Sequence, residues 1–245
     1  MNKVFDEIYE TVWKSIFPGL PPLDLGKFTQ LYTKDIILPQ EYKSAQSGAS
    51  VYSTSEYGYK RFVSPEEVQK RSATDNYMEP KKDISSLADV MTAMKTLAMF
   101  RGSRSLNSEV IEQSDDVYSS SYIFRSAHVY SSQKLMFNYN TKTSEYLLAS
   151  KGSADSAFGI RIMDSSGVSN SFDVTWSAKC ANSYFCHSSF DLRDCMFCFH
   201  LTSKQYCIAN MQFSKEEYET LKTTILKEYF DQLLKPGAFV TQADF

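Results

Sequence analysis

The 245-residue sequence contains only nine glycines and three histidines, and it has no cysteine before Cys180. So little glycine argues against folds that depend on many glycine turns. No run approaches the 18 apolar residues of a membrane span, and the acidic residues near the start leave no apolar stretch typical of a secretory signal. The net charge of −3 gives no broad positive field that would attract nucleic acid or an anionic membrane.

All five cysteines lie between Cys180 and Cys207. An odd number of cysteines in one region is not typical of a secreted disulfide framework. The sequence therefore favours a reduced compartment. We expect the protein either in the cytoplasm of a bacterial host or in a virion assembled there.

A six-residue repeat, Ser-x-x-aliphatic-x-x, occupies the middle of the chain, and repeats of this kind decide a fold. It becomes less regular over residues 150–164, and the serine and aliphatic roles then exchange places. The first block holds Ser108, Ser114, Ser120, Ser126 and Ser132 with Ile111, Val117, Ile123, Val129 and Leu135. The second holds Ser165, Ser171, Ser177, Ser183 and Ser189 with Val168, Val174, Cys180, Cys186 and Leu192.

Both blocks belong to one lattice, formed by the residues whose numbers are divisible by three. Between residues 108 and 207, none of the sixteen aromatic residues lies on it, Lys204 is its one charged member, and all five cysteines lie on it. Positions that accept only small or aliphatic side chains face a space too tight for a ring. A flat strand alternates with period two, so period three requires a bend after almost every inward residue.

Stacked solenoid coils satisfy this requirement, because each coil pairs its backbone with its two neighbours. The predicted fold class is therefore mainly β with flanking helices, namely a narrow parallel β-solenoid (β-helix). Twelve residues per coil is the preferred length, and eighteen is the alternative. The predicted regions are an N-terminal arm, helical and extended, over 1–107, the solenoid over 108–207, and a C-terminal capping helix with a tail over 208–245.

Helical spacing and capping residues predict four helices. They span 3–17, a short segment beginning at Pro65, 85–100 and 214–234. The last two flank the repeat, so we expect them to cap its two ends, where exposed strand edges invite aggregation. The stripe predicted to be buried on the last helix is Leu221, Ile225, Tyr229 and Leu233.

The aromatic side chains of the repeat point outward if the lattice points inward. With a coil of twelve residues, Tyr118 lies one coil from Tyr130, and Phe124 one coil from Met136. Either the N-terminal arm or neighbouring proteins must cover such rings, since a large uncovered apolar patch marks an interface. The predicted interface residues are Tyr118, Phe124, Tyr130, Phe185, Phe190, Phe197 and Phe199.

Three elements near the end of the repeat carry a resemblance. They are Asp194-Cys195-Met196-Phe197-Cys198-Phe199-His200-Leu201, then Lys204-Gln205-Tyr206-Cys207-Ile208-Ala209-Asn210, then Ser214-Lys215-Glu216-Glu217-Tyr218. Over residues 108–235 the chain resembles Ser/Asn/Cys-rich repeat proteins of bacteriophages and candidate-phylum bacteria. Some of those proteins have a zinc-ribbon-like N-terminus, which this chain lacks. The resemblance implies a solenoid-like fold and a phage or bacterial origin, and no activity.

Two kinds of chemistry compete with this structural interpretation. Cys186, Cys195, Cys198 and Cys207 have residue types that bind zinc, but each occupies a lattice position filled elsewhere by serine or valine. Hexapeptide repeats also occur in acyltransferases that use a histidine base. Here the three histidines, His128, His187 and His200, lie off the lattice with no acid partner apparent, and Asp115-Asp116 reads as a solvated pair.

The sequence therefore favours a protein that is not an enzyme and binds no cofactor. The function we expect is that of a structural or assembly protein, most simply a bacteriophage virion component that acts through protein–protein contacts. Its expected partners are other protein subunits, including copies of itself, with no membrane and no nucleic acid. The alternative is a cytoplasmic protein-binding scaffold.

Overall fold

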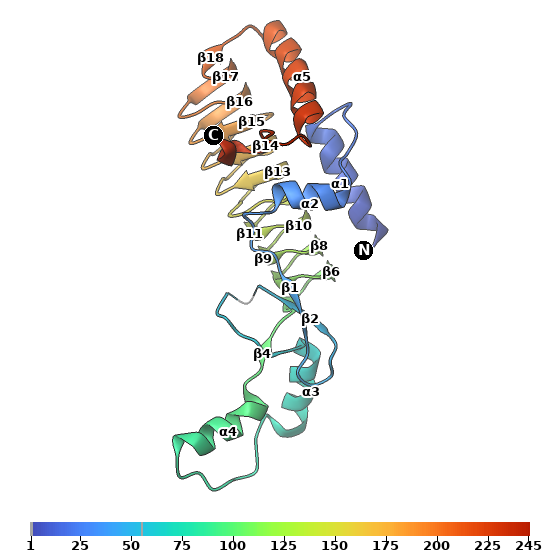
Figure 1. The fold of residues 1–245 in the computed structure, drawn as a ribbon, viewed down its shortest axis with the longest axis vertical. Helices are drawn as coiled ribbons and strands as arrows, with labels where there is room; N and C mark the ends of the chain where they lie inside the picture. The colour runs from blue at the N-terminus through green and yellow to red at the C-terminus, as the bar shows by residue number, and fades with distance from the viewer. Residues whose placement is uncertain (1, 55) are drawn as a thin grey trace.

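The computed structural model describes residues 2–54 and 56–245. Parallel coils stack into a rod, three helices lie along one side of it, and an arm projects from its N-terminal end (Figure 1). The predicted parallel β-solenoid with flanking helices is confirmed.

The helices are α1 (Lys3–Ile16), α2 (Leu25–Tyr32), α3 (Pro65–Asp75), α4 (Leu87–Leu97) and α5 (Lys215–Gln232), followed by the 3₁₀ turn η1 (Gln242–Asp244). The arm strands are β1 (Gln40–Lys43), β2 (Ser50–Ser53), β3 (Phe62–Val63) and β4 (Phe100–Arg101). The solenoid strands are β5 (Ser105–Leu106), β6 (Glu109–Glu112), β7 (Asp115–Tyr118), β8 (Ser121–Phe124), β9 (Ala127–Tyr130), β10 (Gln133–Met136), β11 (Tyr139–Lys142), β12 (Glu145–Leu148), β13 (Ala157–Met163), β14 (Ser169–Thr175), β15 (Tyr184–His187), β16 (Phe190–Met196), β17 (Thr202–Ile208) and β18 (Met211–Gln212).

Each coil contains twelve residues, because strand partners differ by twelve along the chain, as Val117 and Val129 do. From Asn107 to Ala209, every third residue has a positive φ, and so bends the chain four times per coil. Within residues 107–209, Gly152 and Gly167 are the two glycines that adopt this left-handed conformation. The other residues pay a backbone cost there, which the hydrogen bonds between coils offset.

The inward serines form hydrogen-bonded ladders along the rod. The Ser126 hydroxyl donates to the carbonyl of Phe124 at 2.9 Å and accepts the backbone N–H of Asn138, one coil further on, also at 2.9 Å. A buried hydroxyl or N–H without a partner costs roughly 1–3 kcal/mol. Serine therefore suits the lattice because it is small and satisfies a backbone group on each side.

The exchange of the serine and aliphatic columns occurs at Gly159. A Cβ at that position would lie 2.5 Å from Cγ1 of Ile162 and 3.0 Å from Cδ2 of Leu147. Because Gly159 has no side chain, Leu147 from one inward column and Ile162 from another can both occupy the space beside it. The interior thus stays filled where its pattern changes.

Helix α1 lies along an apolar column on the outside of the coils, which repeats every twelve residues from Phe124 to Phe172. Phe5 contacts Phe124 with ring centroids 5.2 Å apart, and Phe17 contacts Phe172 at 5.0 Å. Twelve helical residues rise about 18 Å, and the four coils between Phe124 and Phe172 rise about 19 Å. This match allows each turn of the helix to meet a new coil.

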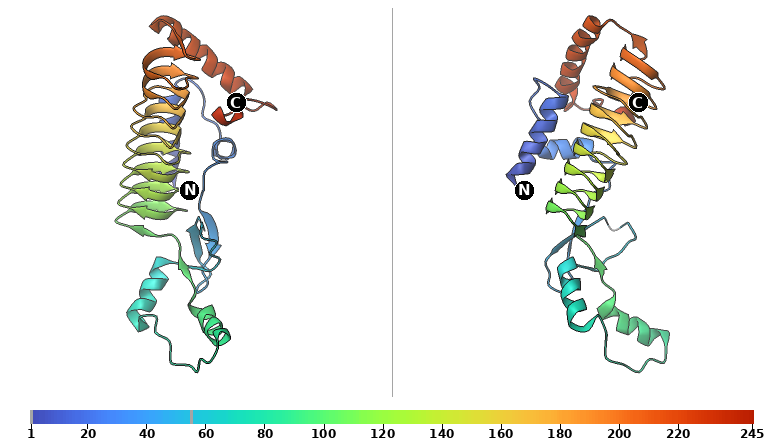
Figure 2. Two further views of the ribbon diagram at one scale, coloured as in Figure 1. Left: turned by 90° about the vertical axis from the view of Figure 1, so that its left-hand side faces the viewer. Right: turned by 180° about the vertical axis from the view of Figure 1, so that it is seen from behind.

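Helices α2 and α5 extend this cover. Tyr32 of α2 and Tyr229 of α5 both pack on Phe172, and their hydroxyls are 2.8 Å apart. Helix α5 starts beyond the last coil and runs back along the rod (Figure 2). Its buried residues are Tyr218, Leu226, Tyr229 and Leu233, so Leu221, which is 37% exposed, was wrongly assigned to the buried stripe.

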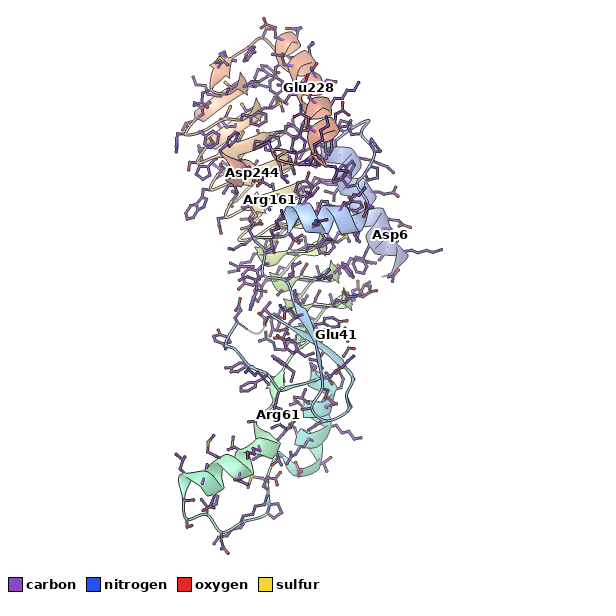
Figure 3. All side chains as sticks on the ribbon, viewed as in Figure 1. Asp6, Glu41, Arg61, Arg161, Glu228 and Asp244 are labelled. Carbon is purple, nitrogen blue, oxygen red and sulfur yellow. The ribbon has the colours of Figure 1, made fainter. Side chains whose placement is uncertain are left out.

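Arg161 ties both ends of the chain to the rod. Its guanidinium donates to both carboxylate oxygens of Asp35 at 2.8 and 2.9 Å, to the carbonyl of Tyr32 at 2.8 Å and to Asp173 at 3.1 Å. Asp173 also accepts the backbone N–H of Gln242 at 2.7 Å. Figure 3 shows Arg161 where α2 crosses the coils, with Asp244 of the tail nearby.

Two side-chain amides terminate the C-terminal end of the rod. Asn210 accepts the N–H of Phe199 and donates to its carbonyl, both at 2.9 Å, as a further strand would. Gln212 donates to the carbonyl of Gln205 at 2.7 Å, while β18 pairs antiparallel with β17. These groups occupy part of the edge that another chain would otherwise extend.

The projecting arm comprises residues 40–54 and 56–103, whereas α1 and α2 pack on the coils. It contains the antiparallel pair β1–β2, the parallel pair β3–β4, and helices α3 and α4. The capping boxes at Ser64 and Ser86 confirm two predicted helix starts. Helix α4 does not cap the first coil as predicted, because the arm carries it to the far end of the molecule (Figures 1 and 2).

Candidate binding cleft between the arm and the first coils

A cleft of about 460 Å³ separates the arm from the first coils. The arm contributes aromatic side chains, among them Tyr59 and Phe100, whose rings stack with centroids 3.5 Å apart. The coils contribute Asp116, His128 and Tyr130, and Arg104 lies between the two parts. The cleft therefore joins a stacked aromatic wall to a cluster of charged groups.

Asp115 and Arg104 form the base of this cluster. Asp115 is 1% exposed and accepts Nε and Nη2 of Arg104, each at 3.0 Å, together with the Arg104 backbone N–H at 2.8 Å. Such two-pronged pairs fix geometry as well as charge. This pair holds the chain at the point where the arm enters the first coil.

Asp116 is the central acceptor of the cluster. One of its oxygens accepts the Tyr130 hydroxyl at 2.8 Å and lies 2.5 Å from Nδ1 of His128, and the other lies 3.3 Å from Nη1 of Arg104. The hydrogen bond from His128, opposed by burial and supported by Tyr130, lowers the pKa of Asp116 to about 2. The residue is therefore a carboxylate at neutral pH.

His128 lies between two carboxylates. Nδ1 contacts Asp116, and Nε2 is 3.4 Å from a carboxylate oxygen of Glu56 in the arm. The hydrogen bond to Asp116 raises the pKa of His128 against the effect of its burial. A protonated imidazole donates from both nitrogens, so His128 links the solenoid to the arm.

This arrangement suits binding and positioning better than proton transfer. Both nitrogens of His128 face carboxylates, so neither is free to accept a proton from a substrate. Burial and Asp116 raise the pKa of Tyr130 to about 12, which keeps its hydroxyl a donor. The cluster is a set of ion pairs in the wall of the cleft, and it joins the arm to the first coils.

The link through His128 predicts a dependence of stability on pH. Because the folded pKa of His128 is raised, its contribution is fully present below its unfolded pKa of about 6.5 and is lost as pH rises through the folded pKa. At the acid end the contribution of Asp116 is lost as pH falls from about 3.9 through about 2. We expect His128→Gln to lower the thermal midpoint most near pH 5, and least near pH 9, in melts followed by circular dichroism.

His200→Gln is the matched control, because His200 is exposed on the same rod. Its melting profile should follow the wild type at every pH. A difference between wild type and His128→Gln that stays constant across this pH range would show that the charge on His128 plays no part in the link.

Sequence reasoning missed this cluster. Asp115 and Asp116 are buried and paired, so their interpretation as a solvated pair is wrong. His128 has an acid partner, contrary to expectation, because residues twelve apart lie on neighbouring coils. With a coil of twelve residues, the spacing of Asp116 and His128 therefore predicts that the two side chains are neighbours.

The predicted interface residues fall into three environments. Phe124 and Phe185 are buried under the chain's own helices. Tyr118, Tyr130, Phe197 and Phe199 are half-buried, and the rings of Tyr118 and Tyr130 stack with centroids 5.6 Å apart. Phe190 is exposed, with 44% of its surface accessible.

The cysteines considered as zinc ligands line the rod's interior. Cys186, Cys195 and Cys198 each place their sulfur 3.2–3.4 Å from the carbonyl two residues earlier. Burial raises the pKa of the Cys186 thiol. Across residues 2–54 and 56–245, no three His, Cys, Asp or Glu side chains are placed to hold a metal ion.

Within the described residues, no helix combines the length and the apolar character needed to span a bilayer. Comparisons of the whole chain with known proteins give no match to a family model, to a curated protein or to a solved structure.

Proposed function

We propose that this chain is a non-enzymatic subunit of a protein assembly, and that copies of it join through helix α4. The observation that carries the proposal is an exposed apolar stripe on that helix. Leu87 is 77% exposed and Met91 is 58% exposed, and none of the residues of α4 is buried. Isolated helices of this length are marginal in water, because most helical stability comes from a packed apolar face.

The spacing of the stripe favours an identical helix as its partner. Leu87, Val90, Met94 and Leu97 alternate intervals of three and four residues, which is the a and d pattern of two heptads. Such a narrow seam fits another helix with the same spacing.

The rest of the molecule supports this role. The helices α1 and α5 already cover the apolar column of the rod, as the contacts of Phe17 and Tyr229 with the buried Phe172 illustrate. The rod then acts as a stiff spacer, and the arm presents the contact surface. We infer that the assembly is a bacteriophage particle, on the basis of the resemblance described above, with a cytoplasmic scaffold as the alternative.

A double variant, Leu87→Ser/Met94→Ser, tests the seam. Each buried side chain contributes about 2 kcal/mol, so removing two should weaken self-association at least about 100-fold. We expect the wild-type chain to form oligomers in light scattering after gel filtration, and the variant to be monomeric at the same concentration. Detection of the chain in purified particles would then separate a virion subunit from a scaffold.

Leu234→Ser is the matched control, because Leu234 is 57% exposed but lies outside the seam. It should associate like the wild type. A wild-type chain that stays monomeric up to submillimolar concentration would contradict the proposal, and so would a double variant that associates as strongly as the control.

A further inference from the structure

The two tryptophans of the chain have opposite environments. Trp13 is fully buried in α1, whereas Trp176 is 66% exposed on the rod. A shallow groove of about 550 Å³ lies beside Trp176, and only coil residues line it. Because helices α1, α2 and α5 contribute nothing to its lining, this wall is open.

Small residues around Trp176 create the groove. On its own column, Gly152, Asp164 and Ser188 occupy the neighbouring coils at intervals of twelve residues. A Cβ at Gly152 would lie 2.2 Å from Oδ1 of Asp164, so the Asp164 carboxylate rests over that glycine. No bulky side chain therefore stands directly below or above Trp176 on its column.

A second ring stands on the other side of the groove. Phe190 is 44% exposed and follows the column of Ala154, Ser166 and Ala178, whose small side chains keep the floor low. Trp176 and Phe190 lie on adjacent coils, on either side of the inward serine column. The ammonium of Lys179 is 5.4 Å from the centroid of the Phe190 ring.

The groove therefore combines two exposed rings with hydroxyl and carboxylate groups. Ser166, Ser188 and Thr202 supply hydroxyls, which both donate and accept, and Asp164 supplies an acceptor. A pyranose ring has the matching chemistry, since its C–H face packs on an aromatic ring and its hydroxyls pair with such groups. We propose that this groove binds an oligosaccharide, with Trp176 as the stacking platform.

Other occupants fit the groove less well. A protein interface needs an apolar centre, and beyond Trp176 and Phe190 the lining consists mainly of small and hydroxyl-bearing residues. Single-stranded nucleic acid needs positive charge for its phosphates. Here the carboxylate of Asp164 lines the groove and repels phosphate, while the ammonium of Lys179 lies over the Phe190 ring and not among the lining residues.

The burial of Trp13 makes fluorescence a direct test. Iodide should quench mainly Trp176, and a bound sugar should protect it. The probes are cellohexaose, maltohexaose and chitohexaose, titrated to millimolar concentration into the full chain. We expect saturable protection by at least one of them, with affinity lost at least about tenfold in Trp176→Ala when measured by calorimetry, and part of it kept in Trp176→Phe.

Two controls keep this test separate from the proposed function. Phe245→Ala removes an aromatic side chain that is 77% exposed at the C-terminal end of the chain, and it should bind the sugar like the wild type. Leu87→Ser/Met94→Ser should do the same, whether or not the chain assembles through α4.

Three results would overturn the inference. The first is an exposed Trp176 that none of the three sugars protects. The second is equal affinity of the wild type and Trp176→Ala in calorimetry. The third is a Trp176 that iodide reaches only after the chain is dissociated by dilution, since a second copy would then occupy the groove.

Discussion

Val129→Asp is expected to abolish the cooperative thermal unfolding of the solenoid, or to lower the free energy of unfolding by about 4 kcal/mol or more. Val129 is fully buried and faces the interior, where Val117 and Thr141 are its neighbours along the rod. A carboxylate there is fully buried, and neither Val117 nor Thr141 carries a charge that could pair with it. Circular dichroism melts and urea titrations measure the loss.

Two control variants separate charge from position. Ser131→Asp places the same carboxylate two residues away on the outer surface, and should change stability by less than about 0.5 kcal/mol. Val129→Ser loses apolar burial of about 2 kcal/mol but introduces a hydroxyl of the kind that the ladders accommodate. Equal effects of Val129→Asp and Ser131→Asp would mean that the residue does not face the interior.

The interior of the rod was predictable because the constraint on it is one-dimensional. Every position divisible by three meets the same narrow space, so a rule on size is repeated along the chain and becomes visible as a lattice. Val117, Val129, Val174 and Cys186 are all fully buried, as the lattice predicted. The stacking of Tyr118 on Tyr130 followed from the same rule.

The arm offered no such repetition. Tyr59 and Phe100 stack closely, yet no period connects residues forty-one positions apart. Helix α2 was missed for a related reason, since it is short, although Asp24 caps it and Phe28 and Tyr32 are its buried face. Local signals of this strength are decided by packing against the coils, and the sequence alone does not show which surface is near.

The candidate sites likewise contain some residues that the repeat predicts and others that only tertiary contacts bring together. Asp116 and His128 were within reach of the sequence, because a coil of twelve residues makes them neighbours. Glu56 was not, since it reaches His128 from the arm. Trp176 was visible as an outward aromatic residue, but its exposure depends on which walls the helices cover, and that arrangement is tertiary.

The same tertiary contacts converge on Arg161, which is 5% exposed and pairs with two carboxylates. Burial alone would lower its pKa, but the hydrogen bonds to Asp35 and the charge of Asp173 raise it. Breaking a buried pair leaves an uncompensated charge at a cost of about 3–5 kcal/mol. We therefore expect Arg161→Met to lower the free energy of unfolding by about this amount at neutral pH.

Asp173 provides a test of whether lost charge pairing, rather than lost packing, causes the destabilisation of Arg161→Met. Burial raises the pKa of Asp173 even in the presence of Arg161, and removal of the guanidinium raises it further. A carboxyl group with a raised folded pKa favours the folded state only when protonated, so the deficit of Arg161→Met should shrink as pH falls. The double variant Arg161→Met/Asp173→Asn should recover much of the loss at neutral pH.

Arg193→Met is the matched control, because Arg193 is exposed on the same rod and should tolerate the change within about 0.5 kcal/mol. A double variant no more stable than Arg161→Met would instead assign the loss to the stem of the arginine and its packing. In that case the ends of the chain would be held by apolar contacts such as Phe17 on Phe172. The charges would then set only the position at which Gln242 of the tail meets the coils.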